Sequence, residues 1–177
     1  MNAYQVRYVS SDLRGKKVPV TGFVAVPAAA WTKSAHRPTV AFHPGTLGSG
    51  PQCAFSKQMT GAYQDAYEGD QIAEFLKAGF AVAATDGMGY VDGSVHTYMI
   101  GQNAGHSLLD IVRASRQIPG GTLNPQGQVA ISGYSEGGAA SLWAAQVAAS
   151  YAPELKVVGA AAGGVPGDLK QTAAKLN

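Results

Sequence analysis

The run Gly-Tyr-Ser-Glu-Gly at residues 133–137 carries the sharpest chemical signal in the sequence. It fits the pattern Gly-x-Ser-x-Gly, follows the apolar residues 128–132 and precedes an Ala-rich segment that reaches Ser150. A strand, a tight turn and a helix in this order hold a serine hydroxyl above the edge of a sheet, where it can attack a carbonyl carbon. Small flanking residues suit the close approach of the two backbones. We therefore predict that Ser135 is a nucleophile; the alternative is a Gly-rich turn with an incidental capping serine.

A serine that attacks a carbonyl needs N–H donors for the negative charge that develops on oxygen. The backbone N–H of Glu136, at the start of the expected helix, would supply one donor, favoured by the helix dipole. The loop of residues 43–46 follows the apolar residues 39–42 and would supply the other. We predict the amide of Gly45 or of Thr46 as this donor, and the residues do not decide between them. The alternative is an ordinary Gly/Pro turn.

Two ionisable side chains accompany these amides. We interpret His43 as a structural histidine that packs the loop rather than as a general base. The residue after the nucleophile directs its side chain away from the point of attack, so we interpret the Glu136 carboxylate as structural and only its amide as functional.

Alternating strands and helices would position these groups. Residues 4–8 and 18–26 alternate loosely around a turn at residues 15–17, which predicts an antiparallel pair. Short apolar runs predict four buried strands at residues 39–42, 80–84, 128–132 and 156–161.

Helical spacing appears between these strands. Ile72, Phe75 and Leu76 predict a helix that starts near Gly69, with a C-terminal cap at Gly79. A second helix is predicted over about residues 103–117, with an inner stripe of Leu108, Ile111, Val112 and Ser115. Buried strands that alternate with helices predict an α/β fold with a mostly parallel sheet, covered on both faces and connected by right-handed crossovers.

Composition narrows the class of protein. The 177 residues are 46% hydrophobic and 14% charged, which fits one folded domain, or part of one, and excludes a disordered chain. The net charge is +2 and no basic run occurs, so we expect no nucleic-acid partner. No apolar stretch approaches the ~20 residues of a membrane span. The four scattered histidines predict no metal site, and we expect no cofactor.

Residues 1–17 lack the apolar core of a secretory signal, so the chain is expected to be either cytosolic or a mature form. The single cysteine, Cys53, cannot form an internal disulfide, and we interpret it as a structural residue or as one paired outside the chain.

Several segments together resemble a known family. They are VAFHPGTLG at residues 40–48, CAFS at 53–56, GFAVAATDGMG at 79–89, HTY at 96–98, LDIVRA at 109–114, GYSEGG at 133–138 and VGAAAGG at 158–164. Their combination resembles the bacterial secretory lipases of the α/β-hydrolases, which are related to fungal lipase A. The chain departs from the family pattern at Pro44, which splits a His-Gly pair, and at Gly-Met-Gly after Asp86, where a Tyr-x-Gly-Leu-Gly run is expected.

The resemblance implies an exported hydrolase of carboxylic esters, with acylglycerols as the expected substrates and a lipid–water interface as an expected partner. It also implies that residues 1–177 form one α/β-hydrolase domain that matches the first part of the family and lacks the C-terminal strands and the lid.

An α/β-hydrolase places its acid and then its histidine after the serine. No histidine follows Ser135 in this sequence. Three explanations stay open. The chain is part of a longer or two-chain protein, or it is a short homologue with little activity. Otherwise an upstream histidine, His96 or His106, has been recruited with Asp86 or Asp92. For Asp86 we favour a structural role at a strand end. Four tyrosines in loops could line an acyl pocket, but we favour a role in packing against the edges of the core for Tyr63, Tyr67, Tyr90 and Tyr98.

The sequence thus predicts a serine carboxylic-ester hydrolase that acts through an acyl-enzyme on Ser135. The alternative is an α/β module of weak or no activity that binds apolar ligands or pairs with another chain, or with its own copy, through an open sheet edge. A peptidase or another acyl-transfer enzyme on the same fold is a third hypothesis.

Overall fold

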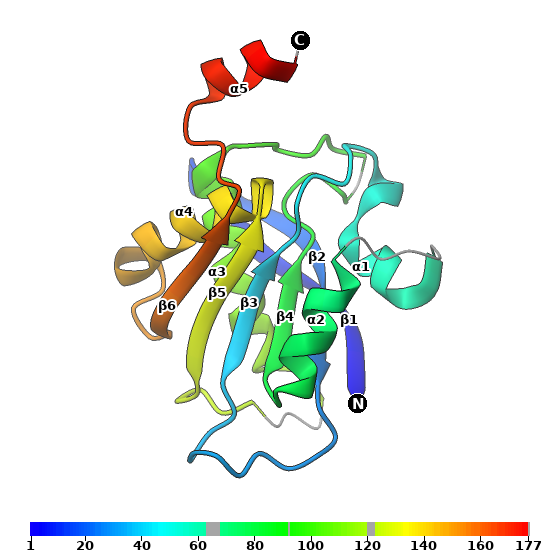
Figure 1. Ribbon diagram of the computed structural model, residues 1–177, viewed down its shortest axis with the longest axis vertical. Coiled ribbons are helices and arrows are strands. Elements are labelled where there is room, and N and C mark those ends of the chain that lie inside the picture. Colours follow the sequence, from blue (N-terminus) through cyan, green and yellow to red (C-terminus); the bar gives the residue numbers. More distant parts are fainter. Residues whose placement is uncertain (63–67, 92, 120–122, 177) are drawn as a thin grey trace.

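The computed structural model describes residues 1–62, 68–91, 93–119 and 123–176. In these ranges six strands form one sheet in the order β1-β2-β4-β3-β5-β6. Figure 1 shows this sheet in the middle of the molecule, with helices in front of it and behind it. None of the helices in these ranges has both the length and the apolar composition of a membrane span.

The first two strands form an antiparallel hairpin, as the alternation of their residues predicts. β1 (Asn2–Ser11) pairs with β2 (Lys17–Val26) along its whole length. The turn between them contains Gly15 at a φ of +79°, a left-handed conformation that favours glycine. β2 also pairs antiparallel with β4 (Ala81–Thr85) and so joins the hairpin to the rest of the sheet.

The other strands run parallel. β3 (Thr39–His43) lies between β4 and β5 (Gln128–Tyr134), and β6 (Lys156–Gly163) pairs with β5. Every residue of β3 and β4 is buried, as their continuous apolar sequences predict. Since parallel strands end at the same edge of a sheet, the loops after β3, β4 and β5 meet there, and this edge carries Ser135.

Helices cover the two faces. α3 (Gly101–Ser115) and α4 (Glu136–Tyr151) pack together behind the sheet, and α2 (Gly69–Lys77) lies in front of β3 and β4 (Figure 1). The predicted inner stripe of α3 is buried at Leu108, Ile111, Val112 and Ser115. On the other face, Ile72 of α2 packs against a cluster that contains Phe42, Phe55 and Val82. The predicted α/β architecture is therefore confirmed.

The structure adds elements that the sequence patterns did not predict. They are the short helices η1 (Pro51–Cys53), α1 (Phe55–Lys57) and η2 (Gln58–Ala62), and α5 (Leu169–Leu176), which lies beyond the carboxyl end of β6 (Figure 1). Cover on both faces was expected for the whole sheet, but β6 is an edge strand whose residues 158–161 are exposed.

Candidate active site

Ser135 occupies the turn between β5 and α4 in a conformation that is unusual for any residue except glycine. Its φ is 56° and its ψ is −117°, and its N–H donates a 2.9 Å hydrogen bond to the carbonyl oxygen of Gly163. The serine carbonyl accepts the N–H of Ala139 at 3.1 Å, which closes the first turn of α4. Among the described non-glycine residues, only Met99 and Ser135 have a positive φ. This geometry matches the strained strand-to-helix turn of a nucleophile elbow.

The glycines around Ser135 are required by backbone contacts. A Cβ at Gly133 would lie 2.4 Å from the carbonyl oxygen of Gly137, and a Cβ at Gly137 would lie 2.0 Å from that of His43. A Cβ at Gly138 would lie 2.3 Å from the carbonyl oxygen of Gly163. Strand β5, helix α4 and the loop after β3 therefore approach so closely that only hydrogen fits between them. The sequence argument for small flanking residues has this physical basis.

The loop after β3 contains the two predicted amide donors. The N–H of Gly45 donates to Oε2 of Glu68 at 2.8 Å, and Glu68 is buried. Burial of the Glu68 carboxyl raises its pKa, although the Gly45 N–H opposes this shift. The Thr46 side chain lies close enough to the Glu136 carboxylate to help lower its pKa, after the larger contribution of His96. Glu68 thus holds the loop through a hydrogen bond and the Glu136 carboxylate lies near it, and neither relation could be read from the sequence.

His43, at the end of β3, is buried. Its Nδ1 lies 2.8 Å from the Pro44 carbonyl oxygen, so Nδ1 carries the proton and donates it. Its Nε2 has no hydrogen-bond partner among the described residues. Burial lowers the pKa of His43, which keeps the ring neutral. These features fit the predicted structural role in the loop.

His96 and Glu136 form a buried pair that the sequence patterns did not suggest. Nε2 of His96 lies 2.5 Å from Oε1 of Glu136, and both side chains are about 95% inaccessible, with exposed fractions of 6% and 5%. Nδ1 of the same ring lies 2.9 Å from the Met88 carbonyl oxygen. Both ring nitrogens are therefore engaged away from the Ser135 hydroxyl. The carboxylate partner of His96 is therefore Glu136, whereas the sequence suggested Asp86 or Asp92. Asp92 lies outside the described residues.

Asp86, at the end of β4, has the structural role that the sequence favoured. Its two carboxylate oxygens accept the N–H of Ser56 at 2.6 Å and the Ser56 hydroxyl at 2.7 Å. This contact joins β4 to the start of α1, 30 residues earlier in the chain.

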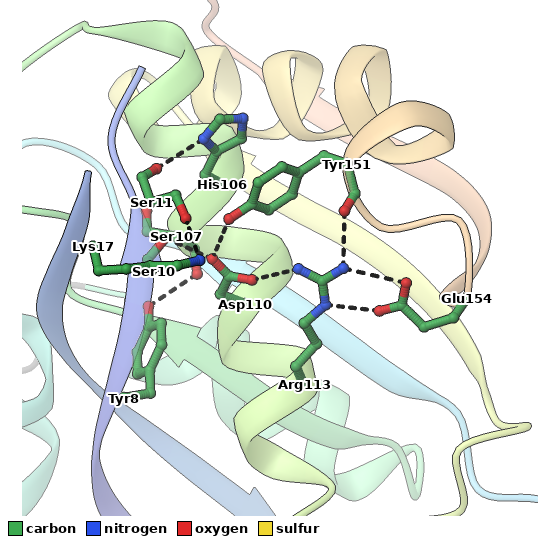
Figure 2. Close-up of polar contacts among 10 residues, drawn as sticks. All are labelled: Tyr8, Ser10, Ser11, Lys17, His106, Ser107, Asp110, Arg113, Tyr151 and Glu154. Atoms are coloured by element: carbon green, nitrogen blue, oxygen red, sulfur yellow. Dashed lines mark hydrogen bonds and ion pairs between the residues drawn. The ribbon is translucent and has the colours of Figure 1, made fainter. Parts of the chain in front are cut away.

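His106 lies in a different polar cluster. Figure 2 shows its ring stacked on Tyr151, with ring centroids 3.8 Å apart, and its Nδ1 hydrogen-bonded to the Ser11 carbonyl oxygen. His36 precedes β3 and so lies at the opposite end of the parallel strands from Ser135. His36 and His106 thus lie apart from the other two histidines, whereas the rings of His43 and His96 both lie beside Gly87. In the described parts of the chain, the ring hydrogen bonds of His43, His96 and His106 go to groups other than Ser135.

The tyrosines divide between core and surface. Tyr90 is buried and its hydroxyl donates to the Gly48 carbonyl oxygen at 2.6 Å, whereas Tyr98 is 54% exposed. Tyr63 and Tyr67 lie outside the described residues.

An open cavity of about 720 Å³ lies next to the elbow. It is lined by the ends of β5 and β6 and by the start of α2, namely Glu68, Asp70, Gln71, Ser132, Gly133, Tyr134, Ala161, Ala162 and Gly163. Tyr134, the residue before Ser135, is 51% exposed. In the described parts of the chain, no group of three or more His, Cys, Asp or Glu side chains is arranged to hold a metal ion.

The sequence comparison decides the family. The model of the secretory lipase family matches residues 55–177, which is more than half of the chain. The chain belongs to the secretory lipase family. Lipase A of Moesziomyces aphidis is 37% identical over 102 residues, which are 58% of this chain and 21% of that protein. A protein of Mycobacterium tuberculosis named as a probable inactive lipase is 36% identical over 106 residues, covering 60% of this chain and 23% of its own length.

The structural comparison gives the same fold. The closed state of Candida antarctica lipase A superposes with a TM-score of 0.77 at 27% sequence identity, covering 99% of this chain and 40% of that one. The resemblance to the secretory lipases and the α/β-hydrolase fold are thus confirmed. The chain spans about a fifth of the length of these curated relatives and two fifths of the solved lipase.

Proposed function

We propose that the protein is a serine hydrolase of carboxylic esters, with Ser135 as the nucleophile. The observation that carries the proposal is the backbone of Ser135, with its φ of 56° and ψ of −117° between β5 and α4. A serine in this conformation is held above the edge of the sheet, at the positive end of a 16-residue helix. Membership of the secretory lipase family supports this chemistry.

In the proposed reaction, the Ser135 oxygen attacks the ester carbonyl carbon while a base takes its proton. The carbonyl oxygen becomes negatively charged and accepts hydrogen bonds from the backbone N–H groups of Glu136 and Thr46. The tetrahedral species collapses to an acyl-enzyme as the alcohol leaves with a proton, and water then releases the acid. Gly45 is the alternative loop donor, but its amide is engaged by Glu68 in this structure.

The base and its carboxylate partner are not among the contacts of Ser135. Both ring nitrogens of His96 are engaged, His43 is buried and neutral, and His106 lies in the cluster of Figure 2. The proposal therefore requires a base from residues outside those contacts, in the same chain or in a complementing one. Acylglycerols, a lipid–water interface and secretion are proposed from the family.

A fluorophosphonate probe tests the nucleophile, because it reacts covalently with activated serine hydroxyls. The protein encoded by the complete reading frame is expected to be labelled at Ser135, and to hydrolyse p-nitrophenyl butyrate. Ser135→Ala is expected to lose both the label and at least about 1,000-fold of the turnover. Peptide mapping identifies the labelled residue. Labelling at another serine, or turnover retained in Ser135→Ala, would overturn the assignment.

The second candidate is a module of weak or no activity that binds apolar ligands or pairs through its sheet edge. The exposed edge strand β6 and the relative named as probably inactive favour it. Absence of fluorophosphonate labelling, together with a dimer in light scattering, is the result that this candidate predicts.

A further inference from the structure

The protonation state of His96 follows from its two contacts. Nδ1 faces the Met88 carbonyl oxygen at 2.9 Å, and a carbonyl can only accept a hydrogen bond. Nε2 faces a Glu136 carboxylate oxygen at 2.5 Å. A neutral imidazole carries one N–H, whereas both contacts need a donor from the ring when the carboxylate is ionised. His96 is therefore an imidazolium paired with an ionised Glu136.

Glu136 connects two parts of the proposed oxyanion site. Its backbone N–H directly follows Ser135, and its carboxylate lies close to the Thr46 side chain of the loop after β3. This loop packs against the elbow, since a Cβ at Gly137 would lie 2.9 Å from the Pro44 carbonyl oxygen. Thr46 and Glu136 are the two proposed amide donors. One buried carboxylate thus lies beside both donors, and His96 neutralises its charge from the loop after β4.

The loop after β3 is held from its other side by Glu68, which accepts the Gly45 N–H at 2.8 Å. Since that amide already has an acceptor, the Thr46 amide is the loop donor in our reaction. Its position depends on where Glu136 holds the Thr46 side chain.

Two glycines after β4 leave the space that His96 needs to reach Glu136. A Cβ at Gly87 would lie 3.1 Å from Cε1 of His96 and 3.2 Å from Nε2 of His43. A Cβ at Gly89 would lie 2.1 Å from the Val95 carbonyl oxygen and 2.4 Å from the Cα of His96. The Gly-Met-Gly run at residues 87–89 therefore lets the loop bring His96 against Glu136.

Aromatic rings enclose the pair. The ring of His96 stacks on Tyr90 with centroids 4.6 Å apart, and it meets Tyr98 edge-on at 6.4 Å. The titratable groups that face the pair from neighbouring elements are His43, Tyr90 and Tyr98, and behind them Asp86 acts on His43 and Tyr90, and Cys53 on Tyr90.

We propose that His96 and Glu136 form a charged positioning pair that holds the Thr46 loop against the elbow, so that both amides face the carbonyl oxygen of the substrate. This inference rests on the proposed function and adds a specific role for two side chains. Neither side chain reacts; each acts through the backbone that it fixes.

The pair gives the reaction an alkaline limit. Burial alone would lower the pKa of His96, but the hydrogen bond and charge of Glu136 outweigh burial and raise it. When the pH rises through this raised pKa, Nε2 loses its proton and faces the carboxylate with a lone pair. The hydrogen bond to Glu136 is then lost, and kcat is expected to fall.

Substitutions test the pair on the protein of the complete reading frame. Glu136→Gln and Thr46→Val are expected to lower kcat about tenfold while KM changes less than about twofold, because donors are displaced without loss of the substrate pocket. Thr46→Ser, which retains the hydroxyl, is expected to recover most of the loss seen in Thr46→Val. His106→Gln serves as the matched histidine control and should retain both kcat and its pH profile.

The pH profile provides a readout that loss of packing would not change. The alkaline fall in kcat should disappear in Glu136→Gln, because the neutral amide that replaces the carboxylate does not require a second proton on the His96 ring. Nitrogen-15 chemical shifts of the His96 ring should show two protonated nitrogens at pH 7 in the unaltered protein. Circular dichroism confirms that each variant is folded.

The outcomes separate the two proposals. If fluorophosphonate labels Ser135 but Glu136→Gln and Thr46→Val keep kcat within twofold, the positioning pair is refuted and the nucleophile stands. A single protonated nitrogen on His96 at pH 7 refutes the charged pair on its own. If Ser135 is not labelled in the unaltered protein, the proposed function fails and the pair's catalytic role fails with it.

Discussion

Two buried carboxylates, Asp110 and Glu136, show how this protein uses similar groups in different ways. Asp110 lies in α3 and accepts hydrogen bonds from the hydroxyls of Ser10 and Tyr151 and from the guanidinium of Arg113, at 2.6–2.7 Å (Figure 2). Glu136 accepts a hydrogen bond from His96 and lies close to Thr46. Each carboxylate joins segments that are distant in sequence, and each has a cation as one partner.

The cation makes the difference. The Glu154 hydrogen bond, together with Asp110, raises the pKa of Arg113, so its charge is permanent at any pH at which the protein is folded. The cation beside Glu136 is a histidine, which can lose its charge near neutral pH. The Asp110 cluster ties β1 to α3 and α4 through a cation that keeps its charge, whereas the Glu136 pair lies next to the proposed nucleophile and contains a cation that titrates. A cation that keeps its charge suits the scaffold, and one that titrates suits a site.

Removal of Asp110 is expected to have the largest effect on stability. Asp110→Ala leaves Nη1 of a partly buried Arg113 and two hydroxyls without their acceptor, which should lower the free energy of unfolding by about 3 kcal/mol. Urea unfolding measures the loss. Glu74→Ala, which breaks an exposed ion pair with Lys77, is the control and should leave the free energy of unfolding unchanged. A loss below about 1 kcal/mol would show that the cluster contributes little to the scaffold.

A methyl group at Gly137 should disturb the region around Ser135 and Glu136, the second of the two regions compared. Gly137→Ala places a Cβ within 2.0 Å of a backbone oxygen, so the elbow or the loop must shift. The expected cost is about 2 kcal/mol of stability, with loss of fluorophosphonate labelling at Ser135. Gly159→Ala, where the new Cβ meets nothing within 4 Å, is the matched control and should retain both. Equal behaviour of the two variants would contradict the close approach at the elbow.

A single hydroxyl in the Asp110 cluster should have a smaller effect. Tyr151→Phe removes the 2.6 Å hydrogen bond to Asp110 but keeps the ring that stacks on His106. The expected loss is about 1 kcal/mol in the free energy of unfolding, with no change in kcat. Tyr98→Phe, at an exposed ring, should change stability by less than about 0.5 kcal/mol. An altered kcat in Tyr151→Phe would mean that the two networks are coupled.

The pH dependence of stability should show the smallest difference, but with a defined sign. The pKa of His96 is raised in the folded protein, so its contribution is complete below the unfolded value of about 6.5 and is lost as the pH rises through the folded value. For Glu136, burial raises the pKa, but the hydrogen bond and the charge of His96 lower it overall. Its contribution is therefore present above the unfolded value and is lost as the pH falls through the folded one.

Thermal melting at a series of pH values tests this sign by comparing the unaltered protein with His96→Gln. The difference in melting temperature should shrink toward alkaline pH. In contrast, the difference caused by Tyr151→Phe should stay constant from pH 6 to 9. A difference in melting temperature between the unaltered protein and His96→Gln that grows with pH would contradict the positive charge assigned to His96.

The sequence predicted the elements of the fold because their signals are local. The continuous apolar runs of β3 and β4 and the stripe of Leu108 and Ile111 in α3 were sufficient. The short helices around Phe55 were missed because three to five residues carry no helical period. The elbow was found for the same reason, since its strand, turn and helix are contiguous.

The rest of the site depends on side chains that meet over long sequence separations. His96 and Glu136 are 40 residues apart, and Gly45 and Glu68 are 23 apart. No spacing rule joins such residues, because their contact depends on how the loops after β3 and β4 fold against each other. Sequence reasoning therefore predicted a nucleophile at Ser135, which stays a prediction, but it assigned Glu136 no partner and did not pair His96 with Glu136.

The positive φ of Ser135 also bears on how the protein can change over evolutionary time. A non-glycine residue in this region of the backbone map destabilises the folded state by roughly 1–3 kcal/mol, whether or not substrate is present. Glycine at this position would remove the strain and the hydroxyl together. In a lineage that no longer needed the chemistry, replacement of this serine would be a stabilising change and so easily accepted. Under the proposed function, a serine at position 135 reflects a balance in which reactivity outweighs stability.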